Sequence, residues 1–206
     1  MIELFYYPTP NGKKISIMLE ELGLNYKINR VDIYKNEQFN SNFSKISPLN
    51  KIPVIKDQDT IIIESGAILI YLAEKNNFQF YPKKFRKEIN EWLMVQVSFI
   101  GPMFGQLHFF KKFNPGSSKY SEDRYLEIVK KIYIYLDKKL SESKFIACDE
   151  YTIVDIGTFP WFCRHEWHNL GLKNYKNLYR WFSQIAERPA VIKGFDPENL
   201  GEKIPL

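Results

Sequence analysis

The segment Thr9-Pro10-Asn11-Gly12 places a hydroxyl and a side-chain amide directly before a predicted helix, after an apolar run at residues 2–7. The start of a helix has free backbone amides and a positive dipole end, so such groups can hold an anion or a thiolate there. Turn formation and helix capping are the commoner roles for these residue types. Tyr6 or Tyr7 could supply a phenol to the same site, although strand alternation directs one of them into the core.

Two other segments pair a turn with groups that can bind a peptide. Ile52-Pro53 opens a predicted strand, where a proline with a cis bond would leave the backbone of Ile52 turned toward a ligand. Glu64-Ser65 ends a strand and starts a helix, so Ser65 can cap that helix or bind a carboxylate. Glu64 can receive an ammonium group. Together the pair would suit the α-amino-acid end of a peptide.

The remaining candidates for chemistry favour structural roles. His165 and His168 share a helical face, but they do not form an HExxH motif and no third ligand follows at useful spacing, so we expect no metal. His108 is typical of a satisfied interior histidine. Cys148 and Cys163 form no CxxC pair, and nothing in the sequence lowers the pKa of either thiol. GxSxG, P-loop and GxGxxG motifs are absent, which weakens the usual hydrolase and nucleotide-dependent classes.

Mixed strand and helix signals fill the first 80 residues, which we expect to form one domain. The pattern predicts strands at 2–7, 26–33, 53–55 and 61–63, and helices at 12–23, at 38–46 more weakly, and from residue 65. This order is not a simple alternation, so the sheet cannot be purely parallel.

The second half of the chain has a helical period and almost no strand signal. We expect a linker at 81–86 and an all-helical domain at 87–206. Thr152-Ile153-Val154-Asp155 is a capping box before an apolar run, which is a folding signal. The uncharged stretch from Trp92 to Phe110 approaches membrane-spanning length, but it contains polar residues and the helix-breaking pair Gly101-Pro102. It predicts a buried, interrupted helix.

Composition is typical of a globular protein, with 45% hydrophobic and 26% charged residues in 206 positions. The net charge of +5 lies wholly in residues 81–206, with twenty basic against fifteen acidic residues, and residues 1–80 balance nine against nine. The basic residues are scattered, so a solvated surface is favoured over nucleic-acid binding. Two unpaired cysteines and no basic-apolar leader predict the cytoplasm and no membrane attachment.

Several of these motifs together resemble the glutathione transferase family. The most specific are residues 50–54 (NKIPV), residues 64–68 (ESGAI) followed by Tyr71-Leu72, and the capping box at 152–155. Residues 8–13 (PTPNGK), 101–103 (GPM) and 105–106 (GQ) are similar to the nu-class group of glutathione-dependent disulfide-bond oxidoreductases. The resemblance implies a thioredoxin-like N-terminal domain joined to an all-helical C-terminal domain.

The resemblance also implies a role for individual residues. Pro53 would be cis, and the backbone of Ile52 would pair with the cysteinyl unit of glutathione. The other implied contacts are Glu64 and Ser65 with the γ-glutamyl end, Gln38 and Lys51 with the glycyl end, Thr9 and Asn11 with the sulfur, and Arg124 from a neighbouring subunit of a homodimer. Thr9 stands where better-known classes have serine or tyrosine, and no cysteine occupies the helix start.

Three functions remain open from the sequence. The first is a disulfide reductase in which bound glutathione, as co-substrate, supplies the thiolate and the protein supplies no redox cysteine. The second is a transferase or peroxidase acting on electrophiles or hydroperoxides, which would need an apolar pocket from residues such as Phe104, His108 and Trp161. The third is a non-catalytic glutathione-binding or regulatory protein, because a fold does not fix a function.

Overall fold

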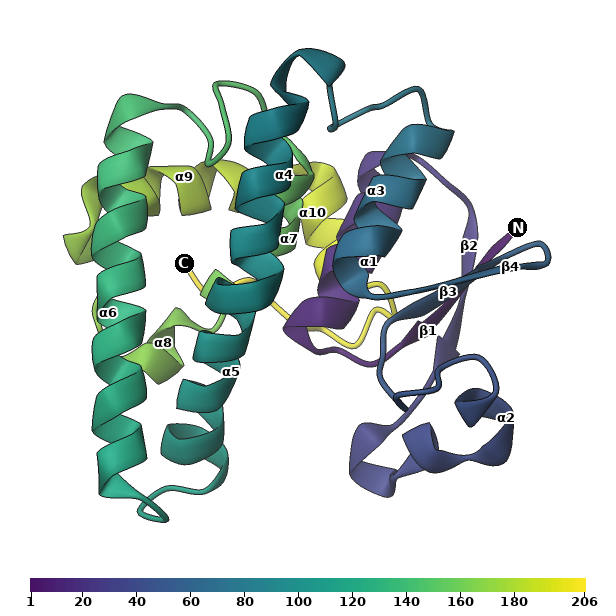
Figure 1. Cartoon of the computed structure of the whole chain (residues 1–206), viewed down its shortest axis with the longest axis horizontal. Coiled ribbons are helices and arrows are strands. Elements are labelled where there is room, and N and C mark those ends of the chain that lie inside the picture. The colour runs from purple at the N-terminus through teal and green to yellow at the C-terminus, as the bar shows by residue number, and fades with distance from the viewer.

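Four short strands form the mixed sheet of the N-terminal part of the chain (Figure 1). The computed structural model describes residues 1–206. The strands are β1 (Ile2–Tyr6), β2 (Tyr26–Arg30), β3 (Val54–Asp57) and β4 (Thr60–Ile63), in the order β2-β1-β3-β4. Leu4 of β1 pairs in parallel with Ile28 and antiparallel with Ile55. The prediction that the sheet is not purely parallel is therefore confirmed.

Alternation along β1 decides which helices cover each face of the sheet. Leu4 and Tyr6 are buried toward helices α1 (Pro10–Glu21) and α3 (Ser65–Lys75), whereas Phe5 packs on the opposite face against Phe43 of α2 (Ser41–Ser44). The predicted strand at 26–33 ends at Arg30. Instead of one helix at 38–46, the chain makes the short turns η1 (Ile33–Lys35) and η2 (Glu37–Phe39) before α2.

The C-terminal part is all helical, as predicted, and lies beside the α1 and α3 face of the sheet (Figure 1). Its helices are α4 (Arg86–Val95), α5 (Gly101–His108), α6 (Lys119–Glu142), α7 (Ile153–Phe162), α8 (His165–His168), α9 (Lys176–Ala186) and α10 (Pro189–Phe195), with 3-10 turns η3 (Lys83–Phe85) and η6 (Leu172–Asn174). The expected capping box begins α7: the Thr152 amide donates to Asp155 Oδ2 at 2.9 Å, and Thr152 Oγ1 accepts from the Val154 amide at 3.3 Å. The precise boundary at residue 80 and the linker at 81–86 stay predictions.

The predicted interrupted helix is one helical run from Lys83 to Phe113, and it is only partly buried. Its interruptions are the π-helical turns η4 (Gln96–Ile100) and η5 (Phe109–Phe113), not breaks. Pro102 has no amide to donate back into the preceding turn, and a π turn absorbs such a defect without ending the helix. The run is long and apolar enough to cross a membrane, yet side chains such as Leu93 and Phe104 belong to the core.

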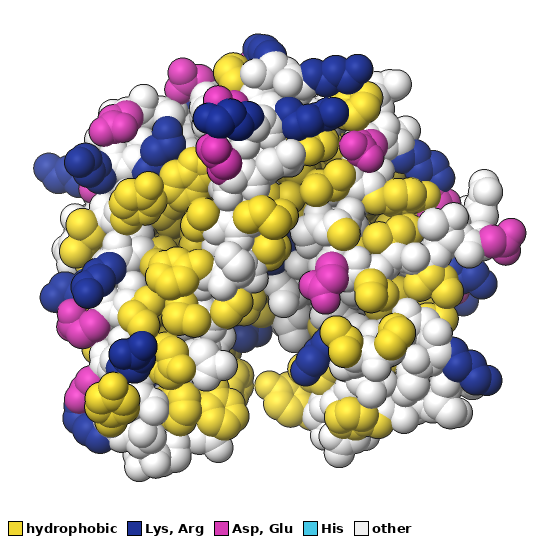
Figure 2. All heavy atoms as spheres, viewed as in Figure 1, with side chains coloured by type: hydrophobic (Ala, Val, Ile, Leu, Met, Phe, Trp, Pro, Cys, Tyr) yellow, Lys and Arg dark blue, Asp and Glu magenta, His cyan; other side chains and the backbone are white.

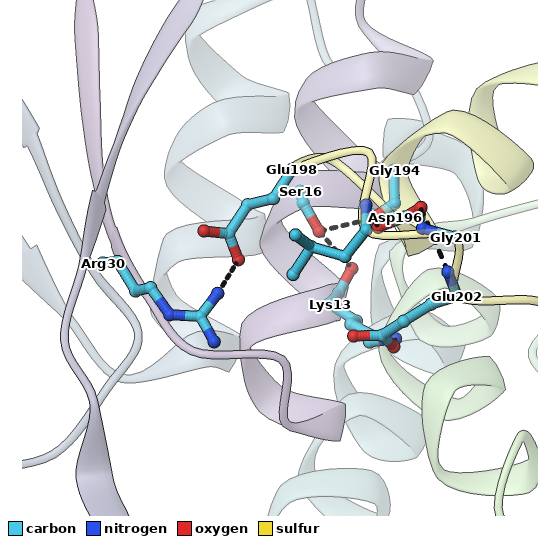
Figure 3. Close-up of polar contacts among 9 residues, drawn as sticks. Lys13, Ser16, Arg30, Gly194, Asp196, Glu198, Gly201 and Glu202 are labelled. Carbon is cyan, nitrogen blue, oxygen red and sulfur yellow. Dashed lines mark hydrogen bonds and ion pairs between the residues drawn. The ribbon is translucent and has the colours of Figure 1, made fainter. Parts of the chain in front are cut away.

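The two parts share one hydrophobic core, because α10 packs directly on α1. A Cβ atom at Gly194 would lie 2.5 Å from the Ile17 Cα, so the two backbones meet at a residue without a side chain. The Ser16 hydroxyl donates to the Gly194 carbonyl at 2.6 Å in the same contact (Figure 3). Helix α1 is thus held by both parts, and its first turn has a fixed position between them.

Candidate functional site

A polar cavity of about 140 Å³ lies where the start of α1 meets the loop before β3 and the start of α3. Its lining residues are Asn11, Ser47, Leu49, Lys51, Ile52, Pro53, Ile63, Glu64 and Ser65. Six of the residues proposed from the sequence are therefore brought together, although they come from three separate segments of the chain.

The loop before β3 presents its backbone to this cavity. The Ile52–Pro53 peptide bond is cis, as the sequence predicted. The amide and carbonyl of Ile52 have no backbone partner in the chain. The hydroxyl of Ser47 donates to the Lys51 carbonyl at 2.8 Å and accepts from the Lys51 amide at 3.0 Å, which fixes the loop. The free groups of Ile52 can therefore pair with an extended peptide.

Ser65 does not cap α3, contrary to one of its predicted roles. It is the first residue of the helix, and its oxygen accepts a hydrogen bond of 3.2 Å from the side-chain nitrogen of Lys14. Glu64 occupies the N-cap position with φ of +67° and makes no side-chain capping bond. A positive φ is strained for a residue with a Cβ atom, and such strain is concentrated at functional sites. The carboxylate of Glu64 and the amide end of α3 both remain available to a ligand.

Lys14 is the residue that sequence reasoning missed. It lies on α1 with 1% of its surface exposed and also donates to Gln96 Oε1 at 2.7 Å, in the π turn η4 of the helical part. Burial lowers the pKa of Lys14 to about 7, although the negative charge of Glu64 opposes this shift. Because this pKa is close to neutral pH, the protonation of Lys14 can change when a charged ligand binds in the neighbouring cavity.

Thr9 is the N-cap of α1, which confirms the structural role considered for it. Its Oγ1 accepts from the Gly12 amide at 3.1 Å, and its hydroxyl proton is not used in that bond. A Cβ atom at Gly12 would stand 2.2 Å from the Tyr7 carbonyl oxygen, so the tight turn requires glycine. One of the two tyrosines is buried, as predicted, and it is Tyr6; neither Tyr6 nor Tyr7 lines the polar cavity.

Two of the proposed residues lie outside the cavity lining. Gln38 is in the short turn η2, where its Oε1 atom is buried without a hydrogen-bond partner. Arg124 is exposed on α6, in the helical part. Within one chain, neither residue contributes to the polar cavity.

The histidines form a buried chain of hydrogen bonds. His108 Nε2 and His168 Nε2 are 2.8 Å apart, and the Tyr133 hydroxyl lies 2.6 Å from His168 Nδ1. Burial lowers the pKa of His108 to about 3 and lowers that of His168 well below its usual value. These are satisfied interior histidines, as expected for His108, and the chain contains no cluster of three or more potential metal ligands among His, Cys, Asp and Glu.

Phe104, His108 and Trp161 do not form the apolar pocket that a transferase or peroxidase would need. All three are almost fully buried, with exposures of 0%, 2% and 8%, because they pack against one another and against neighbouring rings. The cysteines are free. Burial raises the pKa of both thiols, which makes Cys148 and Cys163 poor nucleophiles at neutral pH.

Known proteins match the chain along most of its length. Residues 1–74 match the N-terminal domain of glutathione S-transferases, and residues 99–189 match the C-terminal domain. The disulfide-bond oxidoreductase YfcG of Escherichia coli K12 is 37% identical over 98% of both chains. The disulfide-bond oxidoreductase YghU of the same organism is 36% identical over 94% of this chain and 73% of its own length.

Solved structures agree with this match. A glutathione transferase family member from Pseudomonas fluorescens, solved with two glutathione bound, is 41% identical to this chain and has a TM-score of 0.88. The match covers 94% of this chain and 92% of the Pseudomonas fluorescens chain. A glutathione transferase from Pseudomonas putida, with one glutathione disulfide bound per subunit, is 37% identical with the same TM-score, covering 98% and 92%. This chain belongs to the glutathione S-transferase family.

Proposed function

We propose that the protein is a glutathione-dependent disulfide reductase, in which the reactive sulfur belongs to bound glutathione. The observation that supports this most directly is the combination of a polar cavity lined by groups that can bind a peptide with two poorly nucleophilic cysteines. The names of YfcG and YghU, and the glutathione disulfide in the relative from Pseudomonas putida, point to the same chemistry. Two free cysteines also fit a reducing compartment such as the cytoplasm.

The cavity residues suit the three parts of glutathione in an extended pose. The Ser65 hydroxyl and amide would bind the α-carboxylate of the γ-glutamyl unit, and Glu64 would bind its ammonium group. The free amide and carbonyl of Ile52 would pair with the cysteinyl unit. Lys51 would bind the glycyl carboxylate, with Gln38 as a further donor from η2. Each charged group of glutathione would then face a residue of opposite charge or a hydrogen-bond donor.

The sulfur would lie at the start of α1, beside Thr9 and Asn11. A thiol with pKa near 8.5 is only a few per cent ionised at neutral pH, and lowering that pKa by two units takes about 2.7 kcal/mol. A hydrogen bond to an ionised group contributes on the order of 1.5–3 kcal/mol. The unused Thr9 proton, the Asn11 amide and the positive helix end can supply this stabilisation.

The reaction balances without any redox group on the protein. The glutathione thiolate attacks one sulfur of the substrate disulfide, forming a mixed disulfide and releasing the other sulfur as a thiolate. A second glutathione thiolate attacks the glutathione sulfur of the mixed disulfide. The products are glutathione disulfide and two reduced substrate thiols. Two glutathione molecules per cycle agree with the two that the relative from Pseudomonas fluorescens binds.

An apolar face suggests that the protein works as a homodimer. Met94, Val95 and Phe99 are 50%, 37% and 46% exposed on α4 and η4, and a cavity of about 210 Å³ beside them has seven apolar residues among its eight. Figure 2 shows hydrophobic side chains gathered over this part of the surface. Exposed apolar patches of this kind mark interaction sites. Arg124 lies two helical turns from Lys131, which lines that cavity, and the family resemblance implies that Arg124 reaches glutathione in the partner subunit.

Turnover with two substrate types tests the proposed function. We expect glutathione-dependent reduction of hydroxyethyl disulfide, followed by coupled reduction of the glutathione disulfide formed, to be at least tenfold faster than conjugation of a nitroaromatic electrophile. Faster conjugation would favour a transferase. Calorimetric binding of glutathione without either turnover would favour a non-catalytic binding protein.

A further inference from the structure

A second cavity of about 330 Å³ lies on the other side of the α1 start, between the first turn of α1, the α7–α8 junction and the C-terminal tail. It is lined by Pro8, Pro10, Lys13, Pro160, Cys163, Arg164, Glu166, Trp167, Phe195, Glu202, Lys203 and Pro205. Pro8 and Pro10 flank Thr9, while Asn11 lines the first cavity. The two cavities share no lining residue, but both border the turn at residues 8–11, which carries the groups proposed to face the reactive sulfur.

The C-terminal tail forms one wall of this cavity and is held by charged contacts (Figure 3). Glu202 pairs with Lys13, and Glu198 pairs with Arg30 at 2.6 Å. The Asp196 carboxylate accepts from the amides of Leu200 and Gly201 at 2.9 and 2.8 Å. The Lys13 nitrogen also lies 3.4 Å from the centroid of the Phe195 ring. Lys13 is therefore a satisfied cation, neutralised by the tail.

Arg164 is different, because no carboxylate in the chain pairs with it. None of the ion pairs of the chain involves Arg164. Its guanidinium lies 4.5 Å from the centroid of the Trp167 ring, which leaves the hydrogen-bonding edge free. Arg188, by comparison, holds Glu21 with two bonds of 2.6 and 2.7 Å. Partly buried guanidinium groups normally have such a partner.

The other charged residues that line the cavity do not form an ion pair with Arg164. Glu202 is taken by Lys13, and Glu166 and Lys203 are exposed to water on the rim. Exposed charges contribute little because water screens them, whereas Arg164 is only partly exposed. Burial also lowers the pKa of Arg164, although a guanidinium stays charged at neutral pH. The negative charge of Glu202 acts on Arg164 from the same lining but forms no ion pair with it, so the cavity contains a partly buried guanidinium group without an ion-pair partner.

We propose that Arg164 binds a carboxylate of the substrate and that the second cavity selects disulfides carrying a carboxylate close to the S–S bond. This inference rests on the proposed function. The planar guanidinium matches a carboxylate with two parallel hydrogen bonds, and the Trp167 ring packs against it. Pro8 and Pro10 line this cavity on either side of Thr9, so a ligand bound there would lie next to the turn that is proposed to hold the attacking sulfur. The cavity is large enough for one arm of a small disulfide.

Three disulfides with two methylene groups in each arm test the charge preference on the wild-type protein. Dithiodipropionate carries two carboxylates, hydroxyethyl disulfide is neutral, and cystamine carries two ammonium groups. We expect kcat/KM with glutathione to be about tenfold higher for dithiodipropionate than for cystamine, which is the size of effect that one partly desolvated charge contact gives. Equal values, or a preference for cystamine, would overturn the proposal.

Variants show whether Arg164 causes the preference. Arg164→Gln should reduce the ratio of dithiodipropionate to cystamine to about twofold or less, and Arg164→Lys should keep part of it because the charge remains. Lys203→Gln is the matched control, because this lysine lines the same cavity but is exposed, and it should change the ratio less than twofold. A ratio that falls equally in Lys203→Gln would mean that general surface charge, not Arg164, sets the preference.

A binding measurement separates this inference from the proposed function. Dithiodipropionate is titrated without glutathione, and binding is followed by calorimetry and by the intrinsic tryptophan fluorescence of the protein, to which Trp167 beside Arg164 contributes. We expect Arg164→Gln to weaken binding by about tenfold. If no disulfide is reduced but this difference is found, the anion site stands and the reductase proposal fails. Equal binding by both proteins would refute the anion site even if reduction occurs.

Discussion

The side-chain nitrogen of Lys14 lies 3.2 Å from the hydroxyl oxygen of Ser65, so a buried residue of α1 reaches the wall of the polar cavity. The Ser65 oxygen accepts this bond, and its own proton is free to point into the cavity. The same nitrogen donates to Gln96 in the helical part. Lys14 thus orients the Ser65 hydroxyl so that it can donate a hydrogen bond to a ligand. The same lysine connects Ser65, in the N-terminal part, to Gln96, in the helical part.

The first prediction concerns glutathione affinity. Lys14→Met should raise the dissociation constant of glutathione by about tenfold, because Ser65 loses the donor that orients it and such a bond contributes about 1 kcal/mol or more. Calorimetric titration checks this. Lys87→Met is the control, since Lys87 is 78% exposed on α4 and should leave the affinity unchanged. Equal affinities for wild type and Lys14→Met would remove Lys14 from the site.

The second prediction is proton uptake on binding. Burial holds the pKa of Lys14 at about 7 in the free protein, and a bound carboxylate at Ser65 favours the ammonium form, so binding raises this pKa. Slightly above pH 7, the free lysine is partly neutral and the bound one is protonated, so binding takes up part of a proton. Well below pH 7, both forms are protonated and the uptake disappears.

Calorimetry in two buffers with different ionisation enthalpies measures this uptake. S-methylglutathione is the suitable ligand, because it has no thiol that could release a proton of its own. Wild type should take up more protons than Lys14→Met at a pH of about 7.5. The same uptake in both proteins would show that another group titrates.

The third prediction separates thiolate stabilisation from folding. Asn11→Ala should reduce disulfide turnover at least tenfold with little change in melting temperature, because Asn11 lines the cavity but caps no helix. Thr9→Ala should also reduce turnover tenfold, and it should destabilise the protein by about 1 kcal/mol because Thr9 is the N-cap of α1. Thr9→Ser keeps the hydroxyl and is the control. Wild-type rates in both alanine variants would contradict the proposed roles.

The fourth prediction concerns the partner subunit. Arg124→Ala should raise the dissociation constant of glutathione about tenfold while the protein stays a dimer in sedimentation analysis, because in the proposed homodimer the exposed guanidinium binds a glutathione carboxylate of the partner subunit. Phe99→Lys should instead produce monomers, because it puts a charge into the apolar face. A wild-type protein that sediments as a monomer would refute the cross-subunit contact.

The fifth prediction is that the protein forms no covalent intermediate. Intact-mass spectrometry during turnover should show the unmodified chain, because Cys163 is buried and the pKa of the Cys148 thiol is raised, mainly by burial. A glutathione adduct that forms and decays at the rate of turnover would assign the redox step to a protein cysteine instead.

Local patterns predicted much of the fold and part of the site. Three parts of the site could be predicted because each depends only on a few neighbouring residues. They are the turn at Asn11, the proline after Ile52 and the strand-to-helix junction at Glu64-Ser65, and all three line the cavity. The hairpin of β3 and β4 follows from apolar runs on both sides of a polar turn. Such features depend on short-range chemistry, which a sequence displays directly.

Lys14 and the second cavity depend instead on long-range packing. A lysine in a helical pattern normally faces water, and nothing near Lys14 shows that α3 and Gln96 cover it. Phe104 and Trp161 are apolar residues, which can either line a pocket or fill a core. Their burial in the core is visible only in the packed structure. The sequence likewise does not show that Arg164 forms no ion pair, because its neighbours in the cavity come from distant segments of the chain.

The route of the C-terminal tail matters for anyone who wants to purify or immobilise this protein. Met1 lies at the outer end of the sheet and is 79% exposed, whereas the chain beyond Phe195 returns between the two parts and walls the cavity with Arg164 (Figure 1). An affinity tag fused after Leu206 would start beside that cavity and could pull on the Glu202 contact. Fusion at the opposite end avoids this, so assays of substrate choice should use amino-terminal tags.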